Sequence, residues 1–227
     1  FNEVKHAVGI SNGLDALHIA LRSLGVGPGD EVIVPSNTYI ATALAVEMAG
    51  AKVKFAEPDP HTYNLSPDNI RKAIGPDTKA IMPVHLYGQA CEMTEIMEIA
   101  ERHKLGVIED NAQAHGARFN GKLTGAFGHT NASSFYPTKN LGALGEAGAI
   151  TTNDASLAEA ARIWRNYGSE KRYYNQLKGY NNRIDELQAG LLSLKLRHLH
   201  QWTEERKSAA KHYLNNLSGI SGLSLPY

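Results

Sequence analysis

The sequence has little that would tie it to an oxidising compartment, a membrane or a nucleic acid. Its 227 residues include one cysteine, Cys91, so no internal disulfide forms, and this composition suits a reducing cytoplasm. No apolar run approaches the ~20 residues that a membrane-spanning helix needs, and we expect no secretory signal. Lys plus Arg and Asp plus Glu both total 23, a balance that argues against nucleic acid or an anionic membrane as the main partner.

Two nucleotide-binding patterns are also missing. The glycines do not form G-x-G-x-x-G, which argues against a Rossmann oxidoreductase, and no P-loop with Gly-Lys-Ser/Thr occurs. His85, His115 and His129 are not spaced as a helical metal pair. We therefore expect these histidines to be polar lining or surface side chains, and we expect no metal site.

What the sequence does contain is an alternation of short apolar segments with helical patterns. Segments such as Val32-Ile33-Val34 are apolar throughout, which is typical of parallel strands buried on both faces. The pattern predicts an α/β fold with a mostly parallel central sheet flanked by helices. The expected strands are Val4–Val8, Glu31–Pro35, Lys52–Ala56, Ala80–His85, Gly106–Glu109, Ala132–Tyr136 and Ala147–Thr152. The expected helices are Gly13–Leu24, Thr38–Ala49, Pro67–Ile74, Met93–His103 and Ala155–Arg165.

The pattern changes near residue 183. From Arg183 to Leu217 several leucines fall close to one stripe with Lys and Arg between them, which predicts a long amphipathic helix or a helix pair. We expect residues 1–182 to form a large ligand-binding domain. Residues 183–227 are then an interdomain helix region that leads to a C-terminal small domain outside this chain. The sequence begins at Phe1 rather than Met and both ends look cut, so we expect the larger domain of a longer protein.

One candidate site residue, Asp110, comes at the end of an apolar strand. The strand from Gly106 ends in two carboxylates, Glu109 and Asp110, at the sheet edge where open α/β folds bind ligands. An acid at this edge binds a metal or a ribose, or it pairs with a cationic heterocycle. A capping aspartate that starts the next turn is an equally good interpretation of Asp110 alone.

A second candidate, Lys139, also follows an apolar strand. Hydroxyl side chains and glycines surround it in the sequence, and no other Lys, Arg, Asp or Glu occurs from Thr130 until Glu146. A lysine in such a desolvated pocket loses its proton readily and attacks a carbonyl. A phosphate-binding or structural lysine is the alternative.

The third candidate is the start of the first helix, where the amides of Gly13 and Leu14 are expected to cradle a phosphate. This pattern is weak by itself. Together with Asp110, Lys139 and a serine five residues before the lysine, Ser134, it becomes specific. These groups match the phosphate, the pyridine nitrogen and the aldehyde of pyridoxal 5′-phosphate.

The motifs resemble those of the DegT/DnrJ/EryC1/StrS family of sugar aminotransferases, which depend on pyridoxal phosphate. This resemblance implies the aspartate-aminotransferase-like fold (fold type I). It runs through nearly all of the chain, and the segments around Asp110 and Lys139 are the most specific. The matching stretches are Ser11–Leu17, Ser36–Thr42, Pro83–Gly88, Glu109–Gly116, Ser134–Gly142 and Asn181–Ala189.

The resemblance implies two catalytic residues. Lys139 carries pyridoxal 5′-phosphate as a Schiff base and later moves a proton. Asp110 keeps the ring nitrogen protonated, so that the ring accepts electrons. Beside them, Gln113 contacts the ring 3-hydroxyl.

The resemblance also implies the remaining cofactor contacts. Ser134 and the amides of Gly13 and Leu14 bind the phosphate, and Tyr39 stacks on the ring. Asn181 reaches the phosphate of the neighbouring subunit's cofactor, which implies a homodimer with a shared active site.

The implied reaction is a ping-pong transfer of an amino group from L-glutamate to a nucleotide-linked keto sugar. The motif wording is most similar to the branch that aminates carbon 3 of dTDP-3-keto-6-deoxyhexoses. Amination at carbon 4 of a UDP or GDP sugar is an alternative, and a noncatalytic ligand-binding regulatory domain is a distant one. A dehydratase branch has histidine where this chain has Lys139. Asn111 and Glu146 depart from the family pattern without touching the chemistry.

Overall fold

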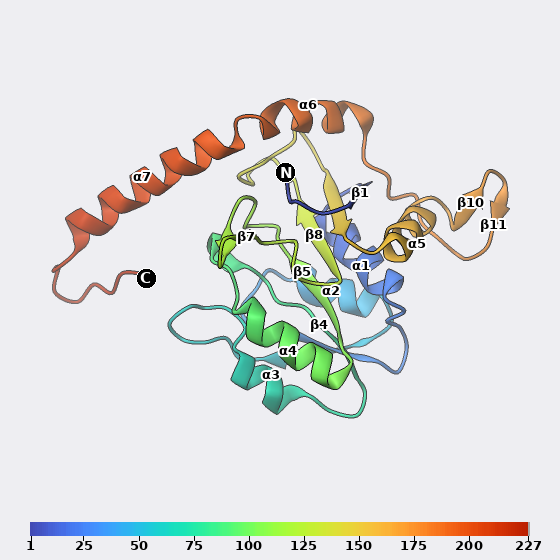
Figure 1. The fold of residues 1–227 in the computed structure, drawn as a ribbon, viewed down its shortest axis with the longest axis horizontal. Coiled ribbons are helices and arrows are strands. Elements are labelled where there is room, and N and C mark those ends of the chain that lie inside the picture. Colours follow the sequence, from blue (N-terminus) through green and yellow to red (C-terminus); the bar gives the residue numbers. More distant parts are fainter. Residues whose placement is uncertain (227) are drawn as a thin grey trace.

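Seven strands form the central sheet of the computed structural model, which describes residues 1–226; Tyr227 lies outside the described residues. The strand order is β1-β9-β8-β5-β4-β2-β3. The pairs from β3 through β8 are parallel, and β9 runs antiparallel to both of its neighbours. The predicted mostly parallel α/β sheet is therefore confirmed (Figure 1). The strands are β1 (His6–Ile10), β2 (Glu31–Pro35), β3 (Lys52–Ala56), β4 (Thr78–Ile81), β5 (Gly106–Asp110), β8 (Thr130–Ser134) and β9 (Gly148–Thr152).

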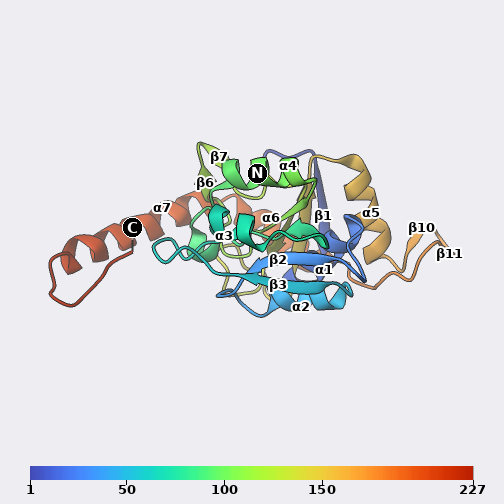
Figure 2. The same ribbon diagram turned by 90° about the horizontal axis from the view of Figure 1, so that it is seen from below.

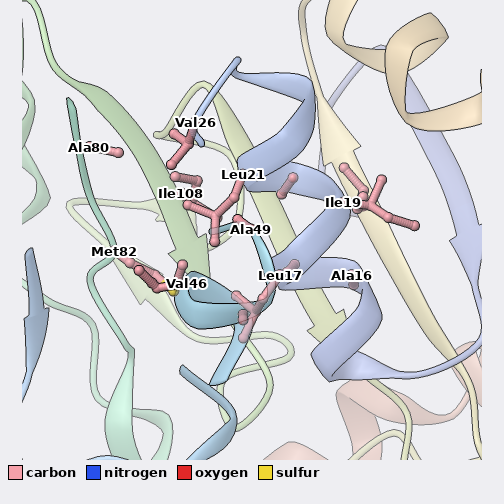
Figure 3. Close-up of a cluster of buried hydrophobic side chains, with 14 of the residues drawn as sticks. Ala16, Leu17, Ile19, Leu21, Val26, Val46, Ala49, Ala80, Met82 and Ile108 are labelled. Atoms are coloured by element: carbon pink, nitrogen blue, oxygen red, sulfur yellow. The ribbon is translucent and has the colours of Figure 1, made fainter. Parts of the chain in front are cut away.

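Helices cover both faces of this sheet. Strand β2 shows why, because Val32 and Val34 pack into one buried cluster while Ile33 packs into the other. The first cluster lies under α1 (Gly13–Ser23), α2 (Ala41–Met48) and α5 (Ala155–Arg165), and the second under α3 (Pro67–Ala73) and α4 (Met93–His103). Figure 2 shows α4 and α2 on opposite sides of β2 and β3. In Figure 3, Leu17 and Leu21 of α1 lie in the first cluster with Ile108 of β5.

The sheet register brings the start of α1 beside the end of β8. Gly148 of β9 is the register partner of both Ile10 in β1 and Ser134 in β8. Ile10 and Ser134 therefore end their strands at the same level of the sheet. Since α1 begins at Gly13, its N-terminus lies next to Ser134 and to the end of β5.

Several predicted elements need correction at their ends. The strand predicted at Ala80–His85 is wrong beyond Ile81, because the regular ladder stops before Pro83, which has no amide to donate, and pairing resumes only as a single bridge at Val84. The helix predicted at Thr38–Ala49 begins only at Ala41. The strand predicted at Ala132–Tyr136 ends at Ser134, which frees the following residues to form the lysine turn.

Smaller elements lie outside the layers. The short helix η1 (Leu86–Gly88) follows β4, and two hairpins were not predicted because each of their strands has only two or three residues. The hairpins are β6 (Arg118–Phe119) with β7 (Lys122–Leu123), and β10 (Ser169–Lys171) with β11 (Tyr174–Asn175).

The C-terminal part forms a helix pair, which is one of the two predicted alternatives. Helix α6 (Glu186–Leu196) is followed by α7 (Leu199–Leu217), and α7 extends away from the sheet (Figure 1). Leu199 is the one buried residue that α7 contributes. Within residues 1–226, none of the helices is long and apolar enough to cross a membrane.

Candidate functional site

A cavity of about 720 Å³ opens at the carboxyl ends of β5 and β8, between the first turns of α1 and α2. It brings together residues that are far apart in the sequence, as expected for the edge of an open α/β sheet. Seven of the eight predicted site residues line it: Gly13, Leu14, Tyr39, Asp110, Gln113, Ser134 and Lys139. The eighth, Asn181, is exposed outside this cavity and pairs with Asn166, so its role across a dimer interface stays a prediction.

Asp110 is the buried acid of the cavity. Its side chain is only 6% exposed, and its two oxygens accept hydrogen bonds from the amide of Ala112 at 3.1 Å and from the hydroxyl of Thr42 at 3.4 Å. Burial raises the pKa of Asp110, while the Ala112 amide and the charge of Lys139 act in the opposite direction. A carboxylate with this much desolvation and so few partners favours a bound cation.

Lys139 lies in a turn that β8 delivers to the same cavity. Its amide donates to the carbonyl of Tyr136 at 2.8 Å, and its side chain is half-buried rather than fully desolvated. Gly142 closes the turn, because a Cβ there would overlap the carbonyl of Pro137. The positive charge of Lys139 acts to lower the pKa of both Asp110 and His115, although burial raises the pKa of Asp110 overall.

The orientation of the Gln113 amide follows from one contact. The backbone amide of Tyr87 donates to Gln113 Oε1 at 2.9 Å. A backbone N–H only donates, so the oxygen of Gln113 faces Tyr87 and its NH₂ group faces away. Tyr87 reaches this position with a φ of 57°, in the left-handed region. Gln113 therefore offers a hydrogen-bond donor to the cavity.

The start of α1 forms an anion cradle. The Asn12 side chain caps the helix by accepting from the amide of Asp15 at 2.8 Å, and the Asn12 carbonyl accepts from Ala16. The amides of Gly13 and Leu14 remain at the positive end of the helix. A Cβ at Gly13 would come within 2.9 Å of the Ser134 hydroxyl, so the missing side chain leaves room at the place where the serine points.

Two buried residues were missed by the sequence analysis. His85 is fully buried and bonds Glu109 at 2.9 Å, so its interpretation as lining or surface was wrong. Thr42, only 2% exposed, donates to Asp110. The sequence did contain one sign of the buried pair of His85 and Glu109. Glu109 and Asp110 are adjacent in a strand, so their side chains must point to opposite faces of the sheet.

His115 is also buried, at 5% exposure, and it is tied to the residue after the lysine. Its Nδ1 donates to Asn140 Oδ1 at 2.8 Å, while Asn140 Nδ2 donates to the His115 carbonyl at 2.7 Å. These two bonds join the segment of Gln113 to the lysine turn. Burial lowers the pKa of His115 to about 4, with the charge of Lys139 acting in the same direction.

The lowered pKa of His115 predicts acid lability. The unfolded chain binds this proton near the ordinary pKa of ~6.5 and the folded chain only near 4, so folding stability is lost as the pH falls between these values. The His115→Gln variant is expected to have a shallower pH dependence of unfolding free energy, by up to about 1.4 kcal/mol per pH unit. Urea unfolding from pH 7.5 to 4.5 measures it. The matched variant of an exposed histidine on α7, His200→Gln, is expected to keep the wild-type slope; equal slopes in all three proteins would contradict the assignment.

The cavity therefore offers four kinds of group to a ligand. It has the buried carboxylate of Asp110 for a cation, the amine of Lys139 and the amide donor of Gln113. The N-terminus of α1, with Ser134 beside it, suits an anion. The mostly parallel seven-stranded sheet flanked by helices is that of the aspartate-aminotransferase-like fold (fold type I). Residues 1–226 match the DegT/DnrJ/EryC1/StrS aminotransferase family, and the chain belongs to that family.

Similar proteins are curated and structurally known. The chain is 50% identical over 224 residues to the dTDP-3-amino-3,4,6-trideoxy-alpha-D-glucose transaminase of Streptomyces venezuelae, covering 99% of this chain and 59% of that protein. It is 54% identical over 213 residues to the dTDP-3-amino-3,6-dideoxy-alpha-D-galactopyranose transaminase of Aneurinibacillus thermoaerophilus, covering 94% and 59%. The crystal structure of S. venezuelae DesV in complex with a ketimine intermediate superposes with a TM-score of 0.97 at 50% identity, covering 100% and 61%. The chain thus spans about three-fifths of the length of the curated relatives it matches.

Proposed function

We propose that this chain is the cofactor-binding part of an aminotransferase that moves an amino group from L-glutamate to a nucleotide-linked keto sugar, with pyridoxal phosphate held in the 720 Å³ cavity. The proposal rests on one observation: a single cavity is lined by Lys139, Asp110 and Gln113 together with the anion cradle at the start of α1, where Gly13 faces Ser134. Family membership supports the reaction class. The names of the two transaminase relatives support a dTDP-3-keto-6-deoxyhexose as acceptor.

Each residue then has a defined task. Pyridoxal phosphate supplies an aldehyde that condenses with amines and a ring that accepts electrons. Asp110 holds the proton on the ring nitrogen, and Gln113 donates from its NH₂ group to the ring oxygen. Ser134 and the first amides of α1 bind the phosphate. Lys139 provides the amine that attaches the cofactor and afterwards moves a proton at the amino-bearing carbon, which is typically worth ~10²–10⁴-fold in rate.

A second cavity supports a phosphorylated acceptor. It measures about 1030 Å³ and shares Gln113, Thr138 and Lys139 with the first. Arg118 and Arg206 line it, and local positive charge is what binding of a nucleotide diphosphate requires.

The assembly and cellular setting are part of the same proposal. Large apolar side chains are exposed on or beside the cavity's rim, which supports a homodimer that shares its active sites; they are Tyr39, Ile40, Leu44, Leu144 and Leu187. Asn181 is then the residue that reaches the partner's cofactor phosphate. We propose residues 1–182 as the large domain, 183–227 as the interdomain helix region, and the cytoplasm, where free Cys91 stays reduced, as the location.

The test is a product assay with the full-length protein. Glutamate and a panel of 3-keto and 4-keto sugars linked to dTDP, UDP or GDP are supplied, and the products are identified by mass spectrometry and NMR. The expected result is 2-oxoglutarate together with a sugar aminated at carbon 3 of a dTDP-linked hexose. Amination at carbon 4 of a UDP or GDP sugar would replace the proposed substrate. Bound cofactor without turnover of any sugar would overturn the proposed activity.

A further inference from the structure

Beneath Asp110, on the other face of the sheet, Glu109 joins two loops to β5. Along β5, Val107 and Glu109 face the cluster under α3 and α4, whereas Ile108 and Asp110 face the opposite side. Glu109 has no exposed surface, and its carboxylate accepts from the amides of Gly125, Phe127 and Gly128 at 2.7 Å each and from His85 Nε2 at 2.9 Å. Burial raises its pKa, but His85 and the amides lower it overall, so Glu109 is ionised.

The hydrogen bonds of His85 define which ring nitrogen carries the proton. The backbone amide of Cys91 donates to Nδ1 at 3.1 Å, so Nδ1 presents a lone pair and Nε2–H donates to Glu109. Cys91 Sγ donates to the Val84 carbonyl at 3.2 Å, so this residue is a neutral thiol and adds no negative charge beside the ring. Burial lowers the pKa of His85, whereas the side chains of Cys91 and Glu109 raise it, to about 10 overall. The contribution of Cys91 to this rise requires a thiolate, but its Sγ donates to the Val84 carbonyl and so carries its proton. The N–H that faces Nδ1 leaves no place for a second proton on the ring. His85 is therefore a neutral imidazole in a single tautomer.

The same residue is bonded to Asp110 through its backbone. The His85 amide donates to the Asp110 carbonyl at 3.1 Å, and the Asp110 amide donates to the Pro83 carbonyl at 2.8 Å. Val84 and Asp110 form a parallel bridge between these two bonds. The loop after β4 thus extends the sheet by one step beyond Ile81, and this step is the one that holds Asp110.

The Glu109 carboxylate fixes two parts of the site at once. Through His85 it holds the loop whose Tyr87 amide orients Gln113. Through the amides of residues 125–128 it holds the turn that leads into β8 and so to Ser134. At metal sites, the loss of a hydrogen-bond partner that lies one bond away from the reacting groups typically lowers metal affinity or activity by ~10–100-fold.

We propose that His85, as a neutral Nε2–H donor to Glu109, is a positioning residue that sets the Asp110 carboxylate against the ring nitrogen of the cofactor. The inference rests on the proposed function. The proposed positioning role belongs to the hydrogen bond between His85 Nε2 and Glu109. The hydrogen bond from the Cys91 amide to His85 Nδ1 only selects the tautomer of the imidazole.

Two substitutions separate the two sides of the ring. In His85→Gln the side-chain amide nitrogen lies near the place of Nε2 and keeps a donor for Glu109, whereas in His85→Asn the side-chain oxygen lies near the place of Nδ1 and keeps only an acceptor for Cys91. In the full-length holoenzyme, His85→Asn is expected to lower kcat about 10–100-fold with KM for the sugar changed less than about threefold. As the pH is raised, the absorbance band of the cofactor with a protonated ring nitrogen is expected to disappear at a lower pH in His85→Asn than in wild type. His85→Gln is expected to restore both readouts to within about threefold of wild type.

The outcomes are distinguishable. If His85 only stabilises the loop, both variants lower the Tm alike and leave the pH dependence of the absorbance unchanged, which overturns the proposal. If His85→Asn does not fold, ¹⁵N NMR of the wild-type imidazole decides, since an imidazolium or an Nδ1–H tautomer overturns it and an Nε2–H tautomer supports it. Failure of the proposed function appears separately, as a wild-type protein that retains no borohydride-reduced cofactor on Lys139.

Discussion

Replacing Lys139 by alanine is expected to abolish turnover of the full-length enzyme while the cofactor still binds noncovalently. The contacts of Asp110, Gln113, Ser134 and the α1 cradle do not involve Lys139 and remain in place. What is lost is the amine that attaches the cofactor and moves the proton, and proton transfer alone accounts for ~10²–10⁴-fold in rate. The measurements are steady-state turnover and mass spectrometry after borohydride treatment, which is expected to find the reduced adduct in wild type only.

Two controls separate chemistry from charge. Lys139→Arg keeps a positive charge near Asp110 and His115, but a guanidinium stays protonated, so this variant is expected to be inactive as well. A small primary amine such as methylamine is expected to restore part of the activity of Lys139→Ala, because it replaces the missing base in the vacated space. A Lys139→Ala protein that turns over at the wild-type rate would refute the role of Lys139.

The meeting of Asp110 and Lys139 in one cavity was predictable because each lies at or beyond the carboxyl end of a buried strand, and the two strands are parallel neighbours. Parallel strands end at the same sheet edge, so two side chains placed just after them are brought close by topology alone. The helix start at Gly13 was predictable for the same reason, since β1 ends level with Ser134. The confirmed part of the fold is the part that hydrophobic periodicity encodes.

The orientation of Gln113 was not predictable from the sequence. It depends on the Tyr87 amide, and Tyr87 has a left-handed backbone that a tyrosine rarely adopts. No local sequence pattern predicts a left-handed tyrosine, because the packed loop around Tyr87 imposes this conformation. The same holds for His85, whose single tautomer depends on an amide six residues further along the chain.

The extent of desolvation around the two key residues was predicted only in part. The scarcity of charged residues around Lys139 suggested a dry pocket, yet its side chain is half-buried, because Pro137 and Thr138 beside it are exposed. Asp110, by contrast, is almost fully buried under Thr42, which comes from a helix 68 residues earlier. A sequence pattern records which residues neighbour each other along a strand and not which helix closes over them.

Asp110→Asn separates the two interpretations that the sequence left open for this residue. If Asp110 were only a cap for the next turn, asparagine would replace it, because Asn and Asp cap about equally well and the oxygen would still accept from the Ala112 amide. If Asp110 holds the ring nitrogen protonated, the uncharged amide fails. We then expect a loss of roughly 10³-fold in kcat, in the range found for loss of one preorganised electrostatic contact. The protonated-ring absorbance is expected to disappear with it, and near-normal activity would support the capping role instead.

The same variant is expected to stabilise the cofactor-free protein. Burial raises the pKa of Asp110, so the folded state binds this proton more tightly than the unfolded state does. The resulting stability is present below the unfolded pKa of ~3.9 and is lost as the pH rises through the folded pKa. At pH 7 the ionised, buried carboxylate therefore costs stability that asparagine does not. The Tm of cofactor-free Asp110→Asn is expected to exceed that of wild type at pH 7, with the difference shrinking toward pH 4. A gain in stability together with the loss of turnover would identify Asp110 as a charge kept for a cationic ligand, whereas a lower Tm at pH 7 would show that the carboxylate stabilises the fold.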